Sequence, residues 1–140
     1  MTQDIPASEI YNWYQGVYKS LNKGGEFNIL EVVTKLLEES IEVCIAAGYD
    51  GNKIEAMCAR FIAKEVAKPT YRSGIDANDL LEELVDVGIV WKTLVGHPDL
   101  FEKVCLIEKE KHRLNSQIRV WRVNENGSLS HVKGQVRGIE

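Results

Sequence analysis

The order of apolar and polar residues predicts helices along most of this chain. Near the N-terminus, apolar side chains fall three or four residues apart and so share one face of a helix. This stripe consists of Ile10, Trp13, Tyr14, Val17, Tyr18 and Leu21. We expect this helix to end at Gly24 and Gly25. A second helix begins at Asn28, where Glu31 follows at capping-box spacing, and stops at Gly48.

Three more helices follow in the same way. Asn52 and Glu55 repeat the capping pattern and precede an apolar stripe. That stripe consists of Ile54, Met57, Cys58, Phe61 and Ile62. Residues 70–79 are expected to form a loop before a fourth helix over about 78–95. A fifth begins near residue 99 and continues into a charged stretch.

The C-terminal residues change to a strand pattern. Residues 118–123 (IRVWRV) and 128–132 (SLSHV) are β-like, and Asn126-Gly127 between them is a hairpin turn signal. The sequence therefore predicts an all-α fold, a helical bundle of about five helices with a short C-terminal β-hairpin or extended tail. Residues 1–122 make the helical domain, and residues 123–140 form a hairpin or tail of the same domain.

Composition narrows the possible functions. The chain has 140 residues, a formal net charge of -4 and a pI of about 5.5. This net negative charge argues against a protein that binds nucleic acid. The three cysteines lack CxxC spacing and are expected to be reduced thiols. We see neither a signal peptide nor a membrane-spanning apolar run, so we expect a cytoplasmic protein without a membrane partner.

Two of the predicted helices carry acids inside apolar segments. Residues 35–44 (KLLEESIEVC) contain Glu38, Glu39 and Glu42, and residues 79–91 (DLLEELVDVGIVW) contain Glu83 and Asp86. Acids three or four residues apart share a helix face. If the two helices pack side by side, four of these carboxylates converge and repel one another unless a cation joins them. Mg²⁺ prefers such oxygen ligands.

The acids have a simpler interpretation as well, since an acidic helix face is most often just solvated. Other metal sites are less consistent with the sequence. No histidine follows a glutamate at the Glu-x-x-His spacing of a di-iron bundle, and no HExxH motif is present. A P-loop and a GxGxxG motif are also absent from the sequence.

The acidic motifs resemble those of a known family. EESIE at residues 38–42, followed by ELVD at 83–86, is similar to the EExxE…ExxD signature of the all-α nucleoside triphosphate pyrophosphohydrolases. These are the MazG-like proteins, with relatives among dimeric dUTPases, dCTP pyrophosphatases and phosphoribosyl-ATP pyrophosphohydrolases. The resemblance covers about residues 28–121. The forty residues that separate the motifs here, 43 to 82, exceed the usual gap and include the third helix.

The resemblance implies Mg²⁺-dependent cleavage of a nucleotide between its α- and β-phosphates, with Mn²⁺ as a possible substitute. It also implies a homodimer or a tetramer of paired dimers. Carried over by position, Glu39, Glu42, Glu83 and Asp86 are the metal ligands. Glu38 is a further ligand or the group that orients and deprotonates the attacking water, so Glu38 and Glu39 are the catalytic candidates.

Two further groups of residues are candidates for contacting the nucleotide. By position in the resemblance, Lys111, Asn115 and Arg119 contact its phosphates or sugar; alternatively, they form a solvated basic helix end. Trp13 and Tyr14 have rings that can stack on a base, although such a stripe is more often core.

The leading hypothesis is a cytosolic, Mg²⁺-dependent nucleotide pyrophosphohydrolase that either clears non-standard or excess nucleotides or acts in a pathway. The alternative is a non-catalytic helical dimerisation or regulatory module whose acids are only surface.

Overall fold

The computed structural model describes residues 4–21, 28–71, 74, 76–125 and 127–137. The chain is mostly helical, with a two-stranded antiparallel hairpin near its C-terminus, as the sequence predicted. The α-helices in the described residues are α1 (Ala7–Leu21), α2 (Ile29–Ala46), α3 (Gly51–Val66), α4 (Ala77–Val95) and α5 (Pro98–Arg113). The expected end of the first helix, at Gly24 and Gly25, lies outside the described residues.

Local capping sets where these helices begin. Asn28 forms the predicted capping box at the start of α2, accepting a hydrogen bond from the backbone N–H of Leu30 while Glu31 accepts one from Asn28. The start of α3 differs from the prediction. Asp50, rather than Asn52, is the N-cap, and its carboxylate accepts from the N–H of Lys53. An aspartate two residues earlier satisfies the same free N–H groups, so the helix begins sooner.

The hairpin starts at a π-helical turn. The turn η1 (Leu114–Ile118) continues α5 and leads into β1 (Arg119–Val123), which pairs with β2 (Leu129–Val136). The predicted boundary at residue 123 therefore falls at the end of the first strand, not at the start of the hairpin. Gly127, in the connection, has a φ of +85°, which a residue without a Cβ adopts readily.

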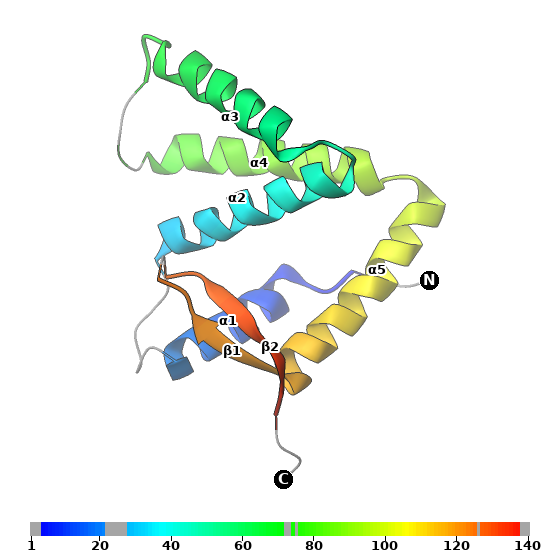
Figure 1. The fold of residues 1–140 in the computed structure, drawn as a ribbon. Coiled ribbons are helices and arrows are strands. Elements are labelled where there is room, and N and C mark those ends of the chain that lie inside the picture. The colour runs from blue at the N-terminus through cyan, green and yellow to red at the C-terminus, as the bar shows by residue number, and fades with distance from the viewer. Residues whose placement is uncertain (1–3, 22–27, 72–73, 75, 126, 138–140) are drawn as a thin grey trace.

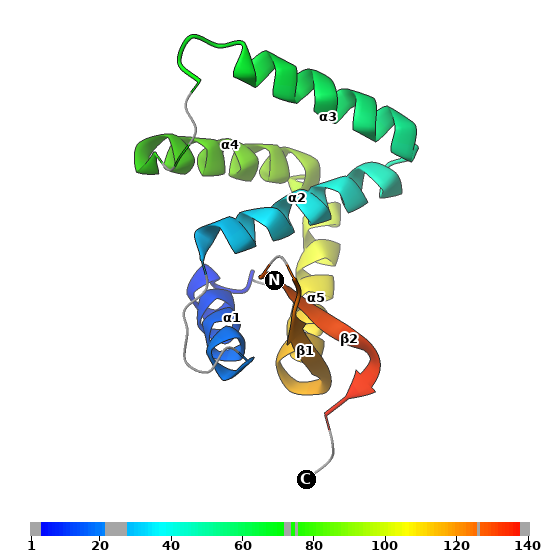
Figure 2. The same cartoon turned by 60° about the vertical axis from the view of Figure 1, so that its left-hand side comes forward.

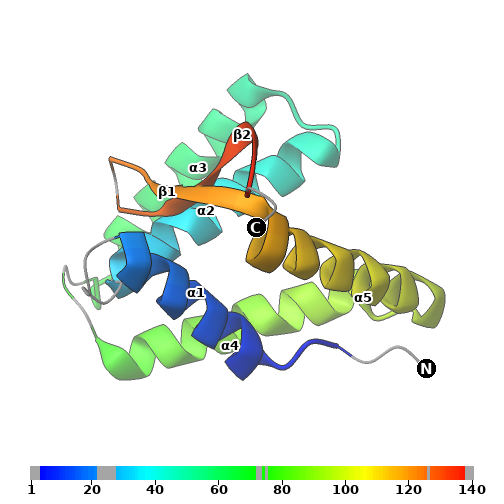
Figure 3. The ribbon, with the colours of Figure 1, turned by 90° about the horizontal axis from the view of Figure 1, so that it is seen from below.

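The elements divide into two groups. Helices α2, α3 and α4 lie on one side, with α3 outermost (Figures 1 and 2). Helix α1, α5 and the hairpin lie on the other side, beyond α2, and α5 continues directly from α4. Seen from below, the hairpin spans the space between α1 and the end of α5 (Figure 3).

One contact joins α1, α2 and the hairpin. The hydroxyl of the buried Tyr18 donates to Glu31 Oε2 at 2.7 Å. A Cβ on Gly127 would overlap the Glu31 side chain, so the glycine allows the connection between the strands to approach α2. Glu31, the second member of the capping box of α2, therefore also lies against the connection between the strands.

Few side chains are fully covered in the described part of the chain. Those that are buried are Tyr18, Ile54, Val95, Cys105, Ser128 and Leu129. By contrast, Ile62 and Leu81 are each 62% exposed, and other large apolar residues of α2, α3 and α4 are similar. Within the described residues, the search for a helix long and apolar enough to cross a membrane found none.

Candidate functional site

A cleft of about 770 Å³ lies between α1, α2, the end of α5 and the hairpin. Its lining brings together eight residues that the sequence singled out. They are Trp13, Tyr14, Glu38, Glu39, Glu42, Lys111, Asn115 and Arg119. These residues come from segments up to about a hundred positions apart in the chain, so the tertiary fold, not the local sequence, collects them.

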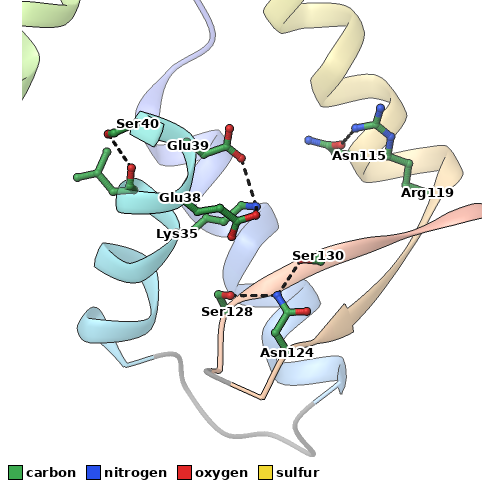
Figure 4. Close-up of polar contacts among 10 residues, drawn as sticks. Lys35, Glu38, Glu39, Ser40, Asn115, Arg119, Asn124, Ser128 and Ser130 are labelled. Carbon is green, nitrogen blue, oxygen red and sulfur yellow. Dashed lines mark hydrogen bonds and ion pairs between the residues drawn. The ribbon is translucent and has the colours of Figure 1, made fainter. Parts of the chain in front are cut away.

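The acidic wall of the cleft is one face of α2. Lys35 precedes Glu38 and Glu39 by three and four residues, and its Nζ lies 3.3 Å and 3.2 Å from their Oε1 atoms. Burial lowers the pKa of Lys35, but its hydrogen bonds to Glu39 and Glu38 outweigh this and raise it. Figure 4 shows these side chains projecting from α2 toward Asn115 and Arg119.

Glu42 has a partner of its own charge. A hydrogen bond with Glu39 and the negative charge of that carboxylate raise the pKa of Glu42, with smaller contributions from desolvation and Glu38. Two neighbouring carboxylates repel each other when both are ionised, and protonation of one relieves that repulsion. The pair is therefore a set of oxygen donors that a cation would relieve of repulsion.

The opposite wall carries amide and cationic groups. Arg119 Nη1 donates to Asn115 Oδ1 at 2.7 Å (Figure 4), and the indole N–H of Trp121 donates to the Asn115 backbone oxygen at 2.8 Å. Asn115 lies in the π-helical turn, a departure from regular helix that often occurs at functional sites. These two bonds hold the Asn115 side chain and backbone at the cleft, and Lys111 lines it one turn earlier.

The hairpin supplies a third wall. Arg122 of β1 and His131 and Lys133 of β2 line the cleft. Desolvation lowers the pKa of His131, and the positive charges of Arg119, Lys133 and Lys35 lower it further. The imidazole thus lies within the electrostatic reach of cations from both the hairpin and α2.

Aromatic rings join the walls at the base of the cleft. Trp13 makes edge contacts with Tyr14, His112 and Trp121, at centroid separations of 6.2, 5.9 and 5.2 Å. Trp121 in turn contacts the ring of His131 at 6.0 Å. Burial raises the pKa of the Tyr14 hydroxyl, and the backbone of Leu129 nearby opposes this shift. Tyr14 thus lies near β2, and both Tyr14 and Leu129 line the cleft.

A second cavity adjoins this cleft. About 390 Å³ in volume, it lies between α1, α5 and Trp91 of α4, and it shares Trp13, Lys111 and Asn115 with the cleft. Its other lining residues are Ile10, Val104, Ile107, Glu108 and His112. A ligand with a flat apolar part and a charged part would find a separate environment for each, on either side of the shared residues.

The acids of α4 lie elsewhere. Glu83 lines a different cavity, of about 490 Å³, beside Val33 of α2 and Asp79 of its own helix, and Asp86 is exposed. In the described residues, no three His, Cys, Asp or Glu side chains are grouped so as to hold a metal ion. Convergence of Glu83 and Asp86 with Glu39 and Glu42 thus stays a prediction.

Eight of the sixteen lining residues were not candidates from the sequence, and four of these eight have ionisable side chains: Lys35, Arg122, His131 and Lys133. Lys35 had a signal, since its spacing to Glu38 and Glu39 predicts helical ion pairs. The other three, Arg122, His131 and Lys133, had none, because strand residues have no fixed relation to a helix a hundred residues away. Comparison of the chain with protein-family models, curated proteins and solved structures finds no significant match.

Proposed function

We propose that this protein is a Mg²⁺-dependent nucleotide pyrophosphohydrolase. It cleaves a nucleoside triphosphate, or a related nucleotide, between the α- and β-phosphates to give the monophosphate and pyrophosphate. A cytoplasmic location and a role in clearing the nucleotide pool belong to the same proposal.

The cleft is the observation that carries this proposal. It combines carboxylates on α2, an amide and cations at the end of α5, and aromatic rings on α1. Triphosphate hydrolysis calls for these classes of group: oxygen ligands for a metal, positive charge for the phosphates and a flat surface for the base. Helix periodicity, apolar patterning and the family resemblance point to all eight of these residues without reference to the fold.

The donors in the cleft fit a hard divalent cation. Glu39 and Glu42 would hold it, because they are three residues apart on α2 and both line the cleft, and the interaction with Glu39 raises the pKa of Glu42. When bound, Mg²⁺ would neutralise part of the triphosphate charge and stabilise the leaving pyrophosphate.

The chain's own residues supply the remaining chemistry. A water molecule attacks the α-phosphorus, and its proton passes to Glu38. The new bond joins the water oxygen to the α-phosphorus, and the broken bond is that between the α-phosphorus and the oxygen bridging to the β-phosphate. Lys111 and Arg119 hold the phosphates in position, with Asn115 fixing the Arg119 guanidinium through their hydrogen bond.

The base occupies the cavity next to Trp13 in this proposal. Trp13 lines both the cleft and the adjoining cavity, so a nucleotide can lie across it with the base on one side and the phosphates on the other. The ring of Tyr14, in edge contact with Trp13, extends this surface.

A second copy of the chain completes the assembly. The apolar side chains exposed on α2, α3 and α4 support a homodimer or a dimer of dimers, since monomers rarely expose so much apolar surface. Packing of α4 against α2, of the same or the other copy, is what would bring Glu83 and Asp86 to the metal. The proposal assigns them that role only in the assembled protein.

A panel of nucleotides with Mg²⁺ tests the activity, with pyrophosphate and phosphate measured separately. We expect pyrophosphate and the monophosphate in equal amounts from at least one nucleotide. Phosphate release alone, or no product from canonical and modified nucleotides, would contradict the proposal.

The competing hypothesis is a non-catalytic dimerisation module, and the same exposed apolar faces favour it. Thermal unfolding separates the two. A nucleotide enzyme gains stability when Mg²⁺ and a non-hydrolysable nucleotide are present together, by about 2.7 kcal/mol at a hundred times the dissociation constant. A passive module keeps the same melting temperature.

A further inference from the structure

The hairpin contributes positively charged side chains to the cleft, which the acidic motifs on the helices did not predict. Arg122 and Lys133 both line the cleft, and they come from its two strands. Neither side chain forms an ion pair with another described residue, whereas Lys35 is engaged by two carboxylates. The hairpin thus offers two positive side chains that no ion pair among the described residues neutralises.

The balance of charge inside the cleft is opposite to that of the whole chain. Five lysines and arginines line it against three glutamates, although the chain carries a formal net charge of -4. The cations are Lys35, Lys111, Arg119, Arg122 and Lys133. A positive cleft in an acidic protein concentrates anions locally, because its walls focus the field. Desolvation lowers the pKa of His131, which also lines the cleft, and the charges of Arg119, Lys133 and Lys35 lower it further.

The cations divide into two sets by position. Lys111 lines both the cleft and the cavity beside Trp13, so it lies where the two meet. Arg122 and Lys133 line the cleft and are not part of the adjoining cavity. If the base occupies that cavity, the hairpin pair meets the end of the ligand that is farther from the base.

We propose that Arg122 and Lys133 bind the β- and γ-phosphates of the substrate, the part that leaves as pyrophosphate, and so make the cleft selective for triphosphates over monophosphates. This inference rests on the proposed function for the orientation of the nucleotide. Arginine suits such a site through its planar pair of donors, and lysine through its compact charge. The hairpin is then a substrate-binding element, and not only a cover for the helices.

The test measures binding of three probes by isothermal titration calorimetry, in the presence of Mg²⁺. The probes are inorganic tripolyphosphate, a non-hydrolysable nucleoside triphosphate and the matching nucleoside monophosphate. The variant is Arg122→Gln with Lys133→Gln, and the matched control is Lys92→Gln with Lys103→Gln, two exposed lysines that line none of the described cavities. Thermal unfolding confirms that both variants fold.

We expect the hairpin variant to bind tripolyphosphate and the triphosphate at least about tenfold more weakly, with less than a twofold change for the monophosphate. The control should bind all three probes as the unchanged protein does. Equal loss for mono- and triphosphate, or no loss at all, would overturn the inference.

Turnover distinguishes this inference from the proposed function. If the unchanged protein releases no pyrophosphate from any nucleotide but the hairpin variant still loses tripolyphosphate binding, the catalytic proposal fails and the phosphate site stands. If nucleotides are cleaved and the variant keeps the KM of the unchanged protein, the catalytic proposal stands and the hairpin inference fails.

Discussion

The two groups of elements differ in how well the described residues cover their apolar side chains. Around the cleft, α1, the end of α5 and the hairpin are joined by ring contacts and hydrogen bonds, and Tyr18, Ser128 and Leu129 are buried there. In the layer of α2, α3 and α4, Ile54 and Val95 are buried, but Phe61 and Val85 are each 60% exposed.

This difference depends on the amount of apolar surface that each region presents and on the elements that surround it. The hairpin and aromatic residues enclose one another, because strands and helices from distant segments meet on several sides. The three long helices leave many apolar side chains exposed in the described residues, and the proposed second copy would cover them. Under that proposal, the cleft is expected to keep its shape in a monomer, while the helical layer gains its apolar burial on assembly.

The largest expected effect falls on the acids that connect the two regions. Under the proposed function, Glu42→Gln should lower kcat by about 10²- to 10³-fold, because the variant would lose a metal ligand or its charge where negative charge develops. Steady-state turnover measures this, with Glu55→Gln on α3 as the control for loss of one exposed carboxylate. Full activity in the Glu42 variant would mean that α2 presents only a solvated face.

Disruption of the helical layer should come next. Val85→Lys places a charge on the exposed face of α4 and should weaken self-association by more than about 30-fold, the effect of losing one strong interface contact. Sedimentation at several concentrations measures it. Lys92→Glu, on the same helix, is the control and should leave association nearly unchanged. A wild-type protein that is monomeric at all concentrations would refute the assembly.

Two glycines with positive φ in the hairpin region, Gly127 and Gly134, can be compared directly. Gly127→Ala should destabilise the fold by about 1–3 kcal/mol, because φ is +85° and a Cβ would overlap Glu31. Gly134→Ala meets the backbone strain alone, since φ is +77° with open space around it. Chemical denaturation measures both. Equal losses would show that the contact between Glu31 and the hairpin is unimportant for stability.

The smallest effect concerns stability and pH. The folded-state pKa of Glu42 is raised, so its contribution to stability is greatest when the carboxyl is protonated and falls as pH rises through that pKa. Glu42→Gln should therefore slightly raise the melting temperature of the metal-free protein at pH 7. The difference should vanish in acid and reverse with Mg²⁺. A variant less stable than wild type at pH 7 without metal would contradict this pKa direction.

Much of the local structure could be predicted from the sequence. Asn28 with Glu31 predicted the start of α2, Gly48 its end, and the strand pattern with Gly127 the hairpin. Each signal acts over a few residues through hydrogen bonds and backbone geometry. The prediction that Asn52 caps α3 was wrong for a local reason, because Asp50, two positions earlier, provides the N-cap instead.

In the candidate site, too, some features follow from local sequence and others from the tertiary structure. Periodicity by itself determined that Glu38, Glu39 and Glu42 share a face of one helix, and that Lys35 lies beside them. Only the tertiary structure decided that this face meets Asn115, Arg119 and the hairpin, and that Glu83 lines another cavity. The physical reason is range: helix periodicity and capping extend over one or two turns, whereas the meeting of distant faces depends on how the whole chain, and any second copy, buries its apolar surface.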